Sequence, residues 1–286
     1  MIEDLEAVLA DFAGRPLVLV GAGRMGGAML LGWLKNGLDP ALVFVRDPSP
    51  SASIATEIAR EGVSLNTSLD VLAVHRPAAL VLSVKPQIMD EVVPSLAPLL
   101  ASDTVVLSIV TGKSIATMET LLEAASHPPA LVRAMPNIPA SVGCAMTVVT
   151  ANGRVSAAQR SLCSALLEAV GVVEWIEDEV LIEAVTALSG SGPAYVFLLA
   201  EAMADAGVDL GLEPEQAMRL ARATLVGAGA LMAESEAPAS SLREGVTSPG
   251  GTTAAALSIL MDAQGLKPLM ARAMKAACDR ARELGG

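Results

Sequence analysis

The sequence contains few of the side chains that attack substrates as nucleophiles or bind metals. Only two histidines occur, His75 and His127, and only three widely spaced cysteines, Cys144, Cys163 and Cys278. Neither set has the spacing of a zinc site or of a disulfide framework. We therefore expect no bound metal, histidines in surface loops, and free thiols in a reducing compartment.

Aromatic residues and positive charge are also scarce. Aromatic side chains make up 2% of the 286 residues and hydrophobic residues 52%, so the core must be built from aliphatic and alanine side chains. The net charge of -12 argues against nucleic acid as a partner, because no general positive field would attract it. A local cationic pocket for a phosphate remains compatible with that charge.

No hydrophobic run is long enough to predict a membrane span. The most apolar stretch, 194–206, is interrupted by Glu201 and Asp205 and is shorter than the roughly 18 to 20 residues that a span requires. The acidic start of the chain, Met1 to Asp4, lacks the positive region of a secretory signal. We expect a cytoplasmic protein with no membrane partner.

Short apolar strands alternate with helical stretches in the first part of the chain. After a helix or arm at 1–13, we expect strands at 16–20, 41–45, 80–84, 104–110, 131–135 and 144–149, and helices at 25–36, 53–60, 88–100 and 115–122. This alternation predicts an α/β fold with a doubly wound, parallel sheet of the Rossmann type.

The pattern changes near Trp175. Beyond it we expect only helices, at 179–188, 193–207, 214–234, 252–263 and 266–284. Residues 1–175 are assigned to a dinucleotide-binding domain and residues 176–286 to an all-α domain. The helices of the second domain carry more apolar surface than a domain of this size buries alone, so we expect it to be covered in a homo-oligomer.

The first motif with chemical meaning is the turn from Gly21 to Gly26, which includes Arg24 and Met25. It lies between an expected strand and an expected helix, the context in which G-x-G-x-x-G binds a dinucleotide. Gly21 permits the tight turn, Gly23 lets the backbone approach a pyrophosphate, and Gly26 allows close packing of helix and strand. The helix N-terminus then offers N–H groups to the anion. A glycine turn without a ligand is the alternative.

The residues after the second strand bear on the choice of cofactor. An acidic residue there favours NAD, whereas an arginine favours the 2′-phosphate of NADP. Arg46 and Asp47 stand there side by side, so both signals are present. Arg24 adds positive charge, and Ser49 and Ser51 could donate to a phosphate. We expect NADP(H) to be preferred, and NAD(H) stays open.

The residues at two further strand ends are expected to line the crevice that binds the cofactor. Val84, Lys85 and Pro86 stand at the end of the strand at 80–84, at the edge where open α/β sheets bind ligands. Lys85 is either a donor to a cofactor ribose or a solvated loop lysine. Asn137, in a rigid turn between two prolines, either fixes a nicotinamide carboxamide or satisfies its own turn.

A second glycine-rich helix start, far along the chain, predicts an anion site. The residues concerned combine a glycine pair with hydroxyl groups: Ser248, Gly250, Gly251, Thr252 and Thr253. Converging N–H and O–H donors of this kind bind a small anion such as a carboxylate. Ordinary capping by Ser248 or Thr252 is the alternative, although capping alone does not need two glycines.

Together these strings resemble the pyrroline-5-carboxylate reductase family. The resemblance is carried, in order along the chain, by Gly21 to Gly26, Val84 to Pro86, Arg133 to Asn137, Leu188 to Tyr195, and Ser248 to Thr253. It extends over nearly the whole chain, from Leu17 to Leu284. The last two landmarks are the most specific.

The resemblance implies a Rossmann domain and a helical domain that interlocks with its partner in a homodimer or in a ring of dimers. It implies an active site between the cofactor domain and the helices of the dimer. There, hydride transfer from NAD(P)H to the small molecule 1-pyrroline-5-carboxylate would give L-proline, the last step of proline biosynthesis. The residues from Ser248 to Thr253 would hold the substrate carboxylate, and Thr253, nearest the ring nitrogen, would be the catalytic group. Val84, Lys85 and Pro86 would contact the nicotinamide half of the cofactor.

The chain departs from the family pattern beside the expected nicotinamide pocket. Ile138 stands where the family usually has threonine, and Val110-Thr111 replaces a pair of small residues. These departures bear on rate and cofactor preference and leave the reaction class standing.

Two rival functions stay open. A reductase like the β-hydroxyacid dehydrogenases would need a lysine on a helix after the cofactor domain, but the only lysines beyond Lys113 are Lys267 and Lys275, late in the chain. A non-catalytic regulator that senses NADP would keep the glycine turn and would not need the carboxylate site.

Overall fold

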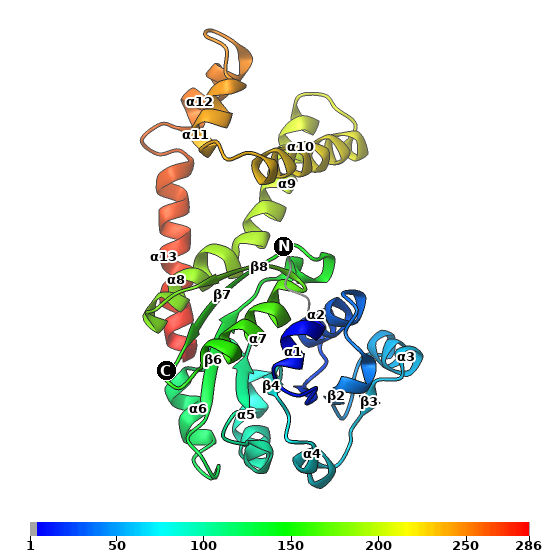
Figure 1. Ribbon diagram of the computed structural model, residues 1–286. Coiled ribbons are helices and arrows are strands. Elements are labelled where there is room, and N and C mark those ends of the chain that lie inside the picture. The colour runs from blue at the N-terminus through cyan, green and yellow to red at the C-terminus, as the bar shows by residue number, and fades with distance from the viewer. Residues whose placement is uncertain (1–4, 286) are drawn as a thin grey trace. The chain divides into compact units, whose positions relative to one another are not determined.

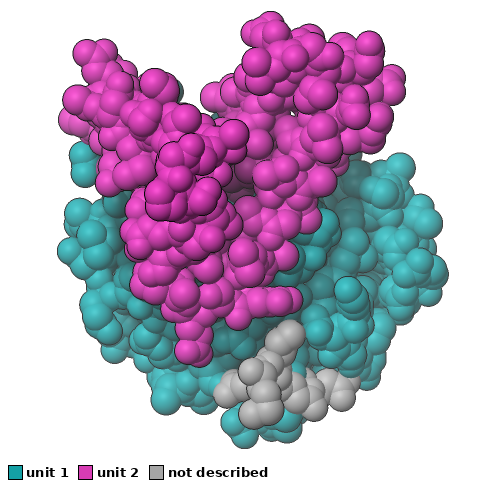
Figure 2. Space-filling view, turned by 90° about the horizontal axis from the view of Figure 1, so that it is seen from above, with its two compact units in different colours: residues 1–190, 280–286 teal, residues 191–279 magenta. Residues whose placement is uncertain are grey.

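The structure is a computed structural model that describes residues 5–285, and its chain forms two compact units. The first unit comprises residues 1–190 and 280–286, and the second comprises residues 191–279 (Figure 2). The first unit therefore continues beyond residue 175, where the strand pattern of the sequence ends. Of the helix or arm expected at 1–13, residues 1–4 lie outside the described residues, and α1 covers Leu5–Ala10.

The first unit is built on an eight-stranded sheet in the order β3-β2-β1-β4-β5-β6-β7-β8 (Figure 1). The strands are β1 (Leu17–Val20), β2 (Val43–Arg46), β3 (Ser64–Leu65), β4 (Ala79–Leu82), β5 (Val105–Ser108), β6 (Ala130–Met135), β7 (Ala145–Ala151) and β8 (Gly171–Trp175). Every pairing from β3 through to β6 is parallel. The order turns back between β1 and β4, and open α/β sheets bind ligands at such a switch point.

The Rossmann-type order is confirmed, but the prediction of a parallel sheet is wrong for β7, the strand expected at 144–149. β7 pairs with β6 in the antiparallel direction, and β8 is parallel to β7. Between β6 and β7 the chain forms only a short 3-10 helix, η4 (Ile138–Val142). Because a parallel pair needs a crossover connection of a dozen or more residues, this link allows only the antiparallel arrangement.

Helices cover both faces of the sheet (Figure 1). One face packs against α1, α2 (Arg24–Lys35), α3 (Ala52–Glu61) and α7 (Ala157–Glu168), and the other against α4 (Leu69–His75), α5 (Met89–Val92), η3 (Val93–Leu99) and α6 (Ile115–Leu121). Leu17 and Leu19 of β1 enter the first core, whereas Val18 and Val20 enter the second. This alternation is the period of two that a doubly covered strand requires.

The helix expected at 88–100 is not continuous. The chain forms the 3-10 helix η2 (Pro86–Ile88), then α5, and then η3, which contains Pro98. Pro94 and Pro98 have no backbone N–H to donate, so an α-helical ladder cannot run through this stretch. A further short 3-10 helix, η1 (Pro40–Leu42), leads into β2.

Helical segments alone follow Trp175 in the part of the chain that the structure describes. The helix expected at 179–188 is instead a series of short pieces, η5 (Glu179–Leu181), α8 (Ile182–Val185) and the π-helix η6 (Thr186–Gly190). The second unit contains α9 (Gly192–Asp209), α10 (Pro214–Glu234), α11 (Ala239–Gly245), α12 (Thr252–Leu260) and most of α13 (Leu266–Gly285). The predicted all-α half of the chain is confirmed.

The second unit buries little of its own apolar surface. Its buried core cluster, among the described residues, is Ala204, Ala217 and Ala221, with Met218 packed against it. Large apolar side chains are exposed along its helices, including Val196, Phe197, Leu198, Leu199, Val226, Leu231, Met232, Ile259 and Leu260. Three buried alanines cannot support five helices alone, so this surface requires a partner.

Candidate active site

The turn between β1 and α2 contains two kinds of glycine, which differ in the space around their α-carbons. Gly21 has a φ of +93°, and a Cβ there would lie 2.5 Å from the carbonyl oxygen of Ser83, just after β4. A Cβ on Gly26 would collide with the Gly21 carbonyl oxygen and lie 2.7 Å from Ser83 Oγ. Gly21 and Gly26 are therefore required because the turn packs directly against the end of β4.

Gly23 is different, because a Cβ there would meet no heavy atom within 4 Å. It is the N-cap residue of α2, and no side chain caps this helix. The first-turn N–H groups of an α-helix have no partner inside the helix, and an anion can accept from them. Exposed Arg24 and half-buried Met25 follow. The open space at Gly23 and the uncapped helix start fit a dinucleotide pyrophosphate.

Asp47 shapes this turn from the end of β2. One carboxylate oxygen accepts a hydrogen bond from the Ala22 N–H at 2.7 Å, and the other accepts from the Ser49 N–H at 2.8 Å. Asn66 fixes the Asp47 backbone in turn, since Oδ1 accepts from Asp47 N at 2.9 Å and Nδ2 donates to Asp47 O at 2.8 Å. Asp47 is thus held in place by the Asn66 side chain, and in turn it fixes the backbone of the glycine-rich turn.

The other side chains expected to determine the cofactor preference lie at or just after the end of β2. Arg46 Nη1 donates to the Thr67 carbonyl oxygen at 2.6 Å. Exposed Ser51 caps α3, because its Oγ accepts from Ile54 N at 3.4 Å. Exposed Ser49 lies between Asp47 and this helix start in the sequence. The β2–α3 loop therefore combines hydroxyl groups with a helix N-terminus.

The ends of β4 and β5 lie next to the glycine turn in the order of the sheet, at its carboxyl edge. Val84 is half-buried, Lys85 is exposed, and Pro86 begins the 3-10 helix η2. At the end of β5, Ser108 Oγ accepts from Val110 N at 3.3 Å, and Gly112 has a φ of +74°. These segments stand at the carboxyl edge of the sheet, as the sequence predicted.

Asn137 is buried, and both groups of its amide bond within the protein. Nδ2 donates to the Ser189 carbonyl oxygen at 2.9 Å, and Oδ1 accepts from Met146 N at 2.9 Å. It therefore joins the start of β7 to the π-helix η6. This geometry favours the structural alternative for Asn137 over contact with a nicotinamide carboxamide.

Sequence reasoning missed a polar network that joins β6, the first residue of α6 and the segment 179–183. Arg133 of β6 is 7% exposed, and its Nη1 lies 2.8 Å from Glu179 Oε1, while Nη2 lies 3.7 Å from Glu183 Oε1. Glu179 Oε1 also accepts from Ile115 N at 2.9 Å. The signal for it was an arginine inside an apolar strand, because a buried charge needs a partner. Its carboxylate partners lie too far along the chain to be identified by spacing.

In the second unit, Ser248 to Thr253 form the expected compact helix start. Gly251 N donates to the Ser248 carbonyl oxygen at 3.0 Å, and Gly250 has a φ of +70°. Gly251 is the N-cap of α12, and no side chain caps the helix, so the alternative of capping by Ser248 or Thr252 is not observed. The N–H groups of the first turn, at Thr252, Thr253 and Ala254, are those that a helix leaves unpaired.

The predicted residues thus fall into two groups. Those expected to bind the cofactor lie in the first unit, at the carboxyl ends of β1, β2, β4 and β6: Gly21, Gly23, Arg24, Met25, Gly26, Arg46, Val84, Lys85, Pro86 and Asn137. Those expected to bind the substrate, from Ser248 to Thr253, lie together in the second unit. Within residues 5–285, no group of three or more histidine, cysteine or acidic side chains is arranged to hold a metal ion.

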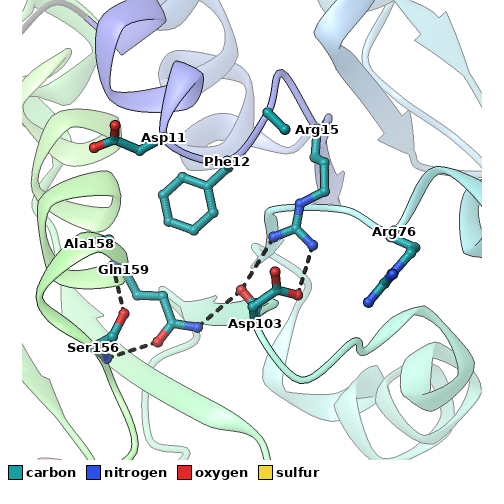
Figure 3. Close-up of a pocket in the computed structure, with 9 residues that line it drawn as sticks. Asp11, Phe12, Arg15, Arg76, Asp103, Ser156, Ala158 and Gln159 are labelled. Carbon is teal, nitrogen blue, oxygen red and sulfur yellow. Dashed lines mark hydrogen bonds and ion pairs between the residues drawn. The ribbon is translucent and has the colours of Figure 1, made fainter.

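The hollow drawn in Figure 3 lies elsewhere, at the amino ends of the strands. It measures about 410 Å³. Its polar groups bond to one another: Arg15 Nη1 lies 2.8 Å from Asp103 Oδ1, and Gln159 Nε2 donates to Asp103 O at 3.1 Å. The hydrogen bond from Arg15 lowers the pKa of Asp103 below its ordinary value. These contacts join the segment before β1, the loop before β5 and α7, and none involves a predicted site residue.

Sheet order, glycine turn and open helix start are those of a dinucleotide-binding protein, here with an appended helical domain. Two family models match the chain accordingly. Residues 16–112 match the family described as NADP oxidoreductase, coenzyme F420-dependent, and residues 179–284 match the family described as pyrroline-5-carboxylate reductase dimerisation.

Full-length relatives carry the identification further. The chain is 42% identical to the pyrroline-5-carboxylate reductase of Pseudomonas aeruginosa over 270 residues, which cover 94% of this chain and 96% of that one. It is 36% identical to the Haemophilus influenzae enzyme of the same name, with 94% and 97% covered. The chain belongs to the pyrroline-5-carboxylate reductase family, so the resemblance found in the sequence is confirmed.

Solved structures agree with the assignment. The Coxiella burnetii pyrroline-5-carboxylate reductase superposes with a TM-score of 0.87 at 34% identity, covering 96% of this chain and 99% of that one. The Plasmodium falciparum pyrroline carboxylate reductase with NADP bound gives a TM-score of 0.78 at 29% identity, covering 95% and 98%. A nicotinamide cofactor, a small-molecule substrate and an oligomeric assembly follow from this membership.

One stretch, Glu179–Asp209, is long and apolar enough to cross a membrane by length and composition alone, with a mean hydropathy of 1.3. The core helices of soluble proteins pass the same test, so one such stretch is weak evidence for a span. It lies within the match to the dimerisation family. An apolar face that pairs subunits has the same composition as one that faces lipid.

Proposed function

We propose that this chain transfers a hydride from NAD(P)H to 1-pyrroline-5-carboxylate and releases L-proline. The observation that carries the substrate assignment is the start of α12, where a glycine pair and two threonines leave the first-turn N–H groups without a side-chain cap. A carboxylate is the ligand that such a group of donors accepts. The activity of the family supplies the rest of the argument.

The cofactor is assigned to the carboxyl edge of the sheet in the first unit. Gly21, Gly23 and Gly26 would admit its pyrophosphate to the N-terminus of α2, beside Arg24 and Met25. Val84, Lys85 and Pro86 would contact the nicotinamide half, which supplies the hydride when the cofactor is bound. Asn137 would support this edge indirectly, because its amide already bonds to Ser189 and Met146.

NADP(H) is the preferred cofactor in this proposal, and NAD(H) is the alternative. The Asp47 carboxylate accepts from two backbone N–H groups, so it is committed to shaping the turn. Exposed Arg24 and Ser49 remain for a 2′-phosphate, the Ser51 hydroxyl could donate to it while it caps α3, and Arg46 stands at the end of β2. Cationic and hydroxyl groups at a helix N-terminus favour a dianion.

The reaction requires little of the protein except that it align the substrate with the nicotinamide. A protonated cyclic imine is already electrophilic, so no catalytic histidine, cysteine or metal is needed. The residues from Ser248 to Thr253 would orient the ring through its carboxylate. Thr253 would hydrogen-bond the ring nitrogen and help to keep it protonated, which is the role proposed for it as the catalytic group.

The decisive assay follows NADPH and NADH oxidation by purified protein with and without 1-pyrroline-5-carboxylate. We expect a substrate-dependent rate with both cofactors and a higher kcat/KM with NADPH. A folded protein that binds NADP(H) but shows no such rate would instead be the non-catalytic regulator.

Thr253→Val tests the substrate site. This change keeps the size and branching of the side chain and removes its hydroxyl group. We expect a lower kcat and an unchanged Kd for NADP(H). An equal loss of both would mean that Thr253 supports the fold and has no direct role in catalysis.

The same proposal includes the assembly. Two copies would pair through the exposed apolar surface of the second unit as a cytoplasmic homodimer, alone or within a ring of dimers. Light scattering on the eluting protein should give at least twice the mass of one chain. A stable monomer at micromolar concentration would contradict this part of the proposal.

A further inference from the structure

Partly buried polar contacts connect residues 179–190 to β6 and to the turn that follows it. Arg133 of β6, whose side chain is 8% exposed, contacts Glu179 at 2.8 Å and Glu183 at 3.7 Å. Asn137, just beyond the end of β6, donates to the Ser189 carbonyl oxygen at 2.9 Å. One strand and its following turn therefore hold this segment at its beginning, its middle and its end.

The same contacts reach the loop beyond β5. Glu179 Oε1 accepts from Arg133 and also from the N–H of Ile115, the first residue of α6, at 2.9 Å. The preceding loop, 109–114, leaves the carboxyl end of β5 beside the expected nicotinamide pocket. A single carboxylate oxygen thus connects this loop, the buried arginine and the segment 179–190.

The segment ends in an unusual backbone. Thr186–Gly190 is a π-helix, a form that is rare and is frequently found at functional sites. A Cβ on Gly190 would lie 2.8 Å from Met135 Cε, so η6 packs closely against the last residue of β6. Asn137 fixes the same π-helix through the Ser189 carbonyl oxygen. Packing and hydrogen bonding therefore define one position for η6 against the sheet.

We propose that Arg133, Glu179 and Asn137 are positioning residues that hold the loop 109–114 and the π-helix η6 in one arrangement, and that hydride transfer depends on this arrangement. The inference rests on the proposed function. None of the three needs to touch the substrate. Their effect on rate arises because a displacement of about 1 Å in a reacting geometry lowers a rate roughly 100-fold.

The test compares two arginines of the first unit. Arg133 and Arg15 each lie 2.8 Å from a carboxylate oxygen, and their side chains are 8% and 16% exposed. Arg15, however, stands before β1, at the opposite edge of the sheet from the glycine turn. Arg133→Met and Arg15→Met therefore each remove a short ion pair to a carboxylate, and only the first belongs to the network.

For Arg133→Met we expect kcat to fall by about 10- to 100-fold while KM for NAD(P)H changes little. Arg15→Met should keep the wild-type kcat. Amide hydrogen exchange should become faster at Ile115 and across residues 186–190 in Arg133→Met and should stay unchanged there in Arg15→Met. Equal losses of kcat in the two variants, or unchanged exchange at both segments in Arg133→Met, would overturn the inference.

Glu179 provides a milder pair of variants in case Arg133→Met does not fold. Glu179→Gln keeps a carbonyl oxygen for the Ile115 N–H and loses the charge, whereas Glu179→Ala loses both. We expect kcat to fall in the order wild type, Gln, Ala, with exchange at Ile115 accelerated mainly in Ala. A Gln variant as slow as Ala, with exchange unchanged in both, would contradict the network.

Hydrogen exchange is measured without substrate and so reports on the coupling itself. If the wild-type protein fails to reduce 1-pyrroline-5-carboxylate, the proposed function falls while the coupling can still be observed. If the protein is active and the exchange pattern is absent, the inference alone falls.

Discussion

Asp47 Oδ2 accepts a hydrogen bond from the backbone N–H of Ala22, at 2.7 Å, inside the glycine-rich turn. An acidic residue at this position of a dinucleotide site usually faces the ribose hydroxyls of NAD. Here the second carboxylate oxygen is also engaged, by the Ser49 N–H. The side chain that resembles a cofactor ligand in the sequence therefore shapes the turn that is proposed to bind the cofactor.

Replacing Asp47 by alanine should weaken the binding of NADPH and NADH to a similar extent. The change removes a charged acceptor from the Ala22 N–H, and hydrogen bonds to charged groups contribute about 1.5–3 kcal/mol. We expect the Kd values for NADPH and NADH, measured by calorimetry, each to rise by roughly 10- to 100-fold. A loss confined to NADH would show that Asp47 binds the ribose directly.

Arg24→Ala should affect one cofactor only. If the exposed guanidinium faces the 2′-phosphate, its removal should lower kcat/KM for NADPH by about 10-fold, the size of one exposed charge-assisted contact. The value for NADH should change by less than about twofold. Arg60→Ala, on the surface of α3, is the control and should alter neither. Equal losses for both cofactors would place Arg24 at the pyrophosphate.

The two end positions of the glycine turn should respond differently from its middle. Gly26→Ala places a methyl group against the Gly21 carbonyl oxygen and Ser83 Oγ, so we expect about 1–3 kcal/mol of destabilisation. Gly23→Ala meets nothing in the protein, so its Tm should match the wild type while its affinity for NADP(H) falls. A destabilised Gly23→Ala with normal cofactor affinity would reject the pyrophosphate site.

The ion pair between Arg15 and Asp103 should make stability depend on pH. The Arg15 hydrogen bond lowers the pKa of Asp103 in the folded protein. A carboxyl group of this kind stabilises the fold above its unfolded pKa, about 4, and loses that contribution as the pH falls through the folded value. Arg15→Met should therefore lower the Tm slightly at pH 7, since a partly exposed pair contributes at most about 1 kcal/mol.

The difference in Tm between wild type and Arg15→Met should shrink as the pH falls below about 4. In an Asp103→Asn background, the arginine substitution should have little effect at any pH. A difference that persists undiminished at pH 2.5 would mean that Arg15 acts through its packing against Phe12, whose ring lies 5.9 Å from the guanidinium carbon.

The sequence was sufficient to predict structural elements that are determined by residues close together in the chain. The glycine-rich turns at Gly21 to Gly26 and Ser248 to Thr253 were expected to precede helices, and α2 and α12 begin there. The helix α10 was expected at its observed bounds, Pro214–Glu234, because a proline begins it and its apolar residues recur at helical spacing. Local rules decide such elements.

Features that depend on distant partners were not predictable in this way. The antiparallel direction of β7 follows from the short connection between β6 and β7. The spacing of residues in the sequence predicted the two strands but did not indicate their relative direction. Nothing near Asn137 in the sequence indicates that its amide will meet Ser189, and nothing near Arg133 indicates Glu179. These pairs exist because the tertiary fold brings distant segments together, so only the structure identifies them.

The second unit has a consequence for how the protein is made and maintained in a cell. With only alanines in its buried cluster among the described residues, its helices gain little by folding as a single copy. When folding and association are linked in this way, apparent stability depends on protein concentration. A newly synthesised chain would remain vulnerable to proteases until it meets a second copy, so its abundance should fall more steeply than its rate of synthesis.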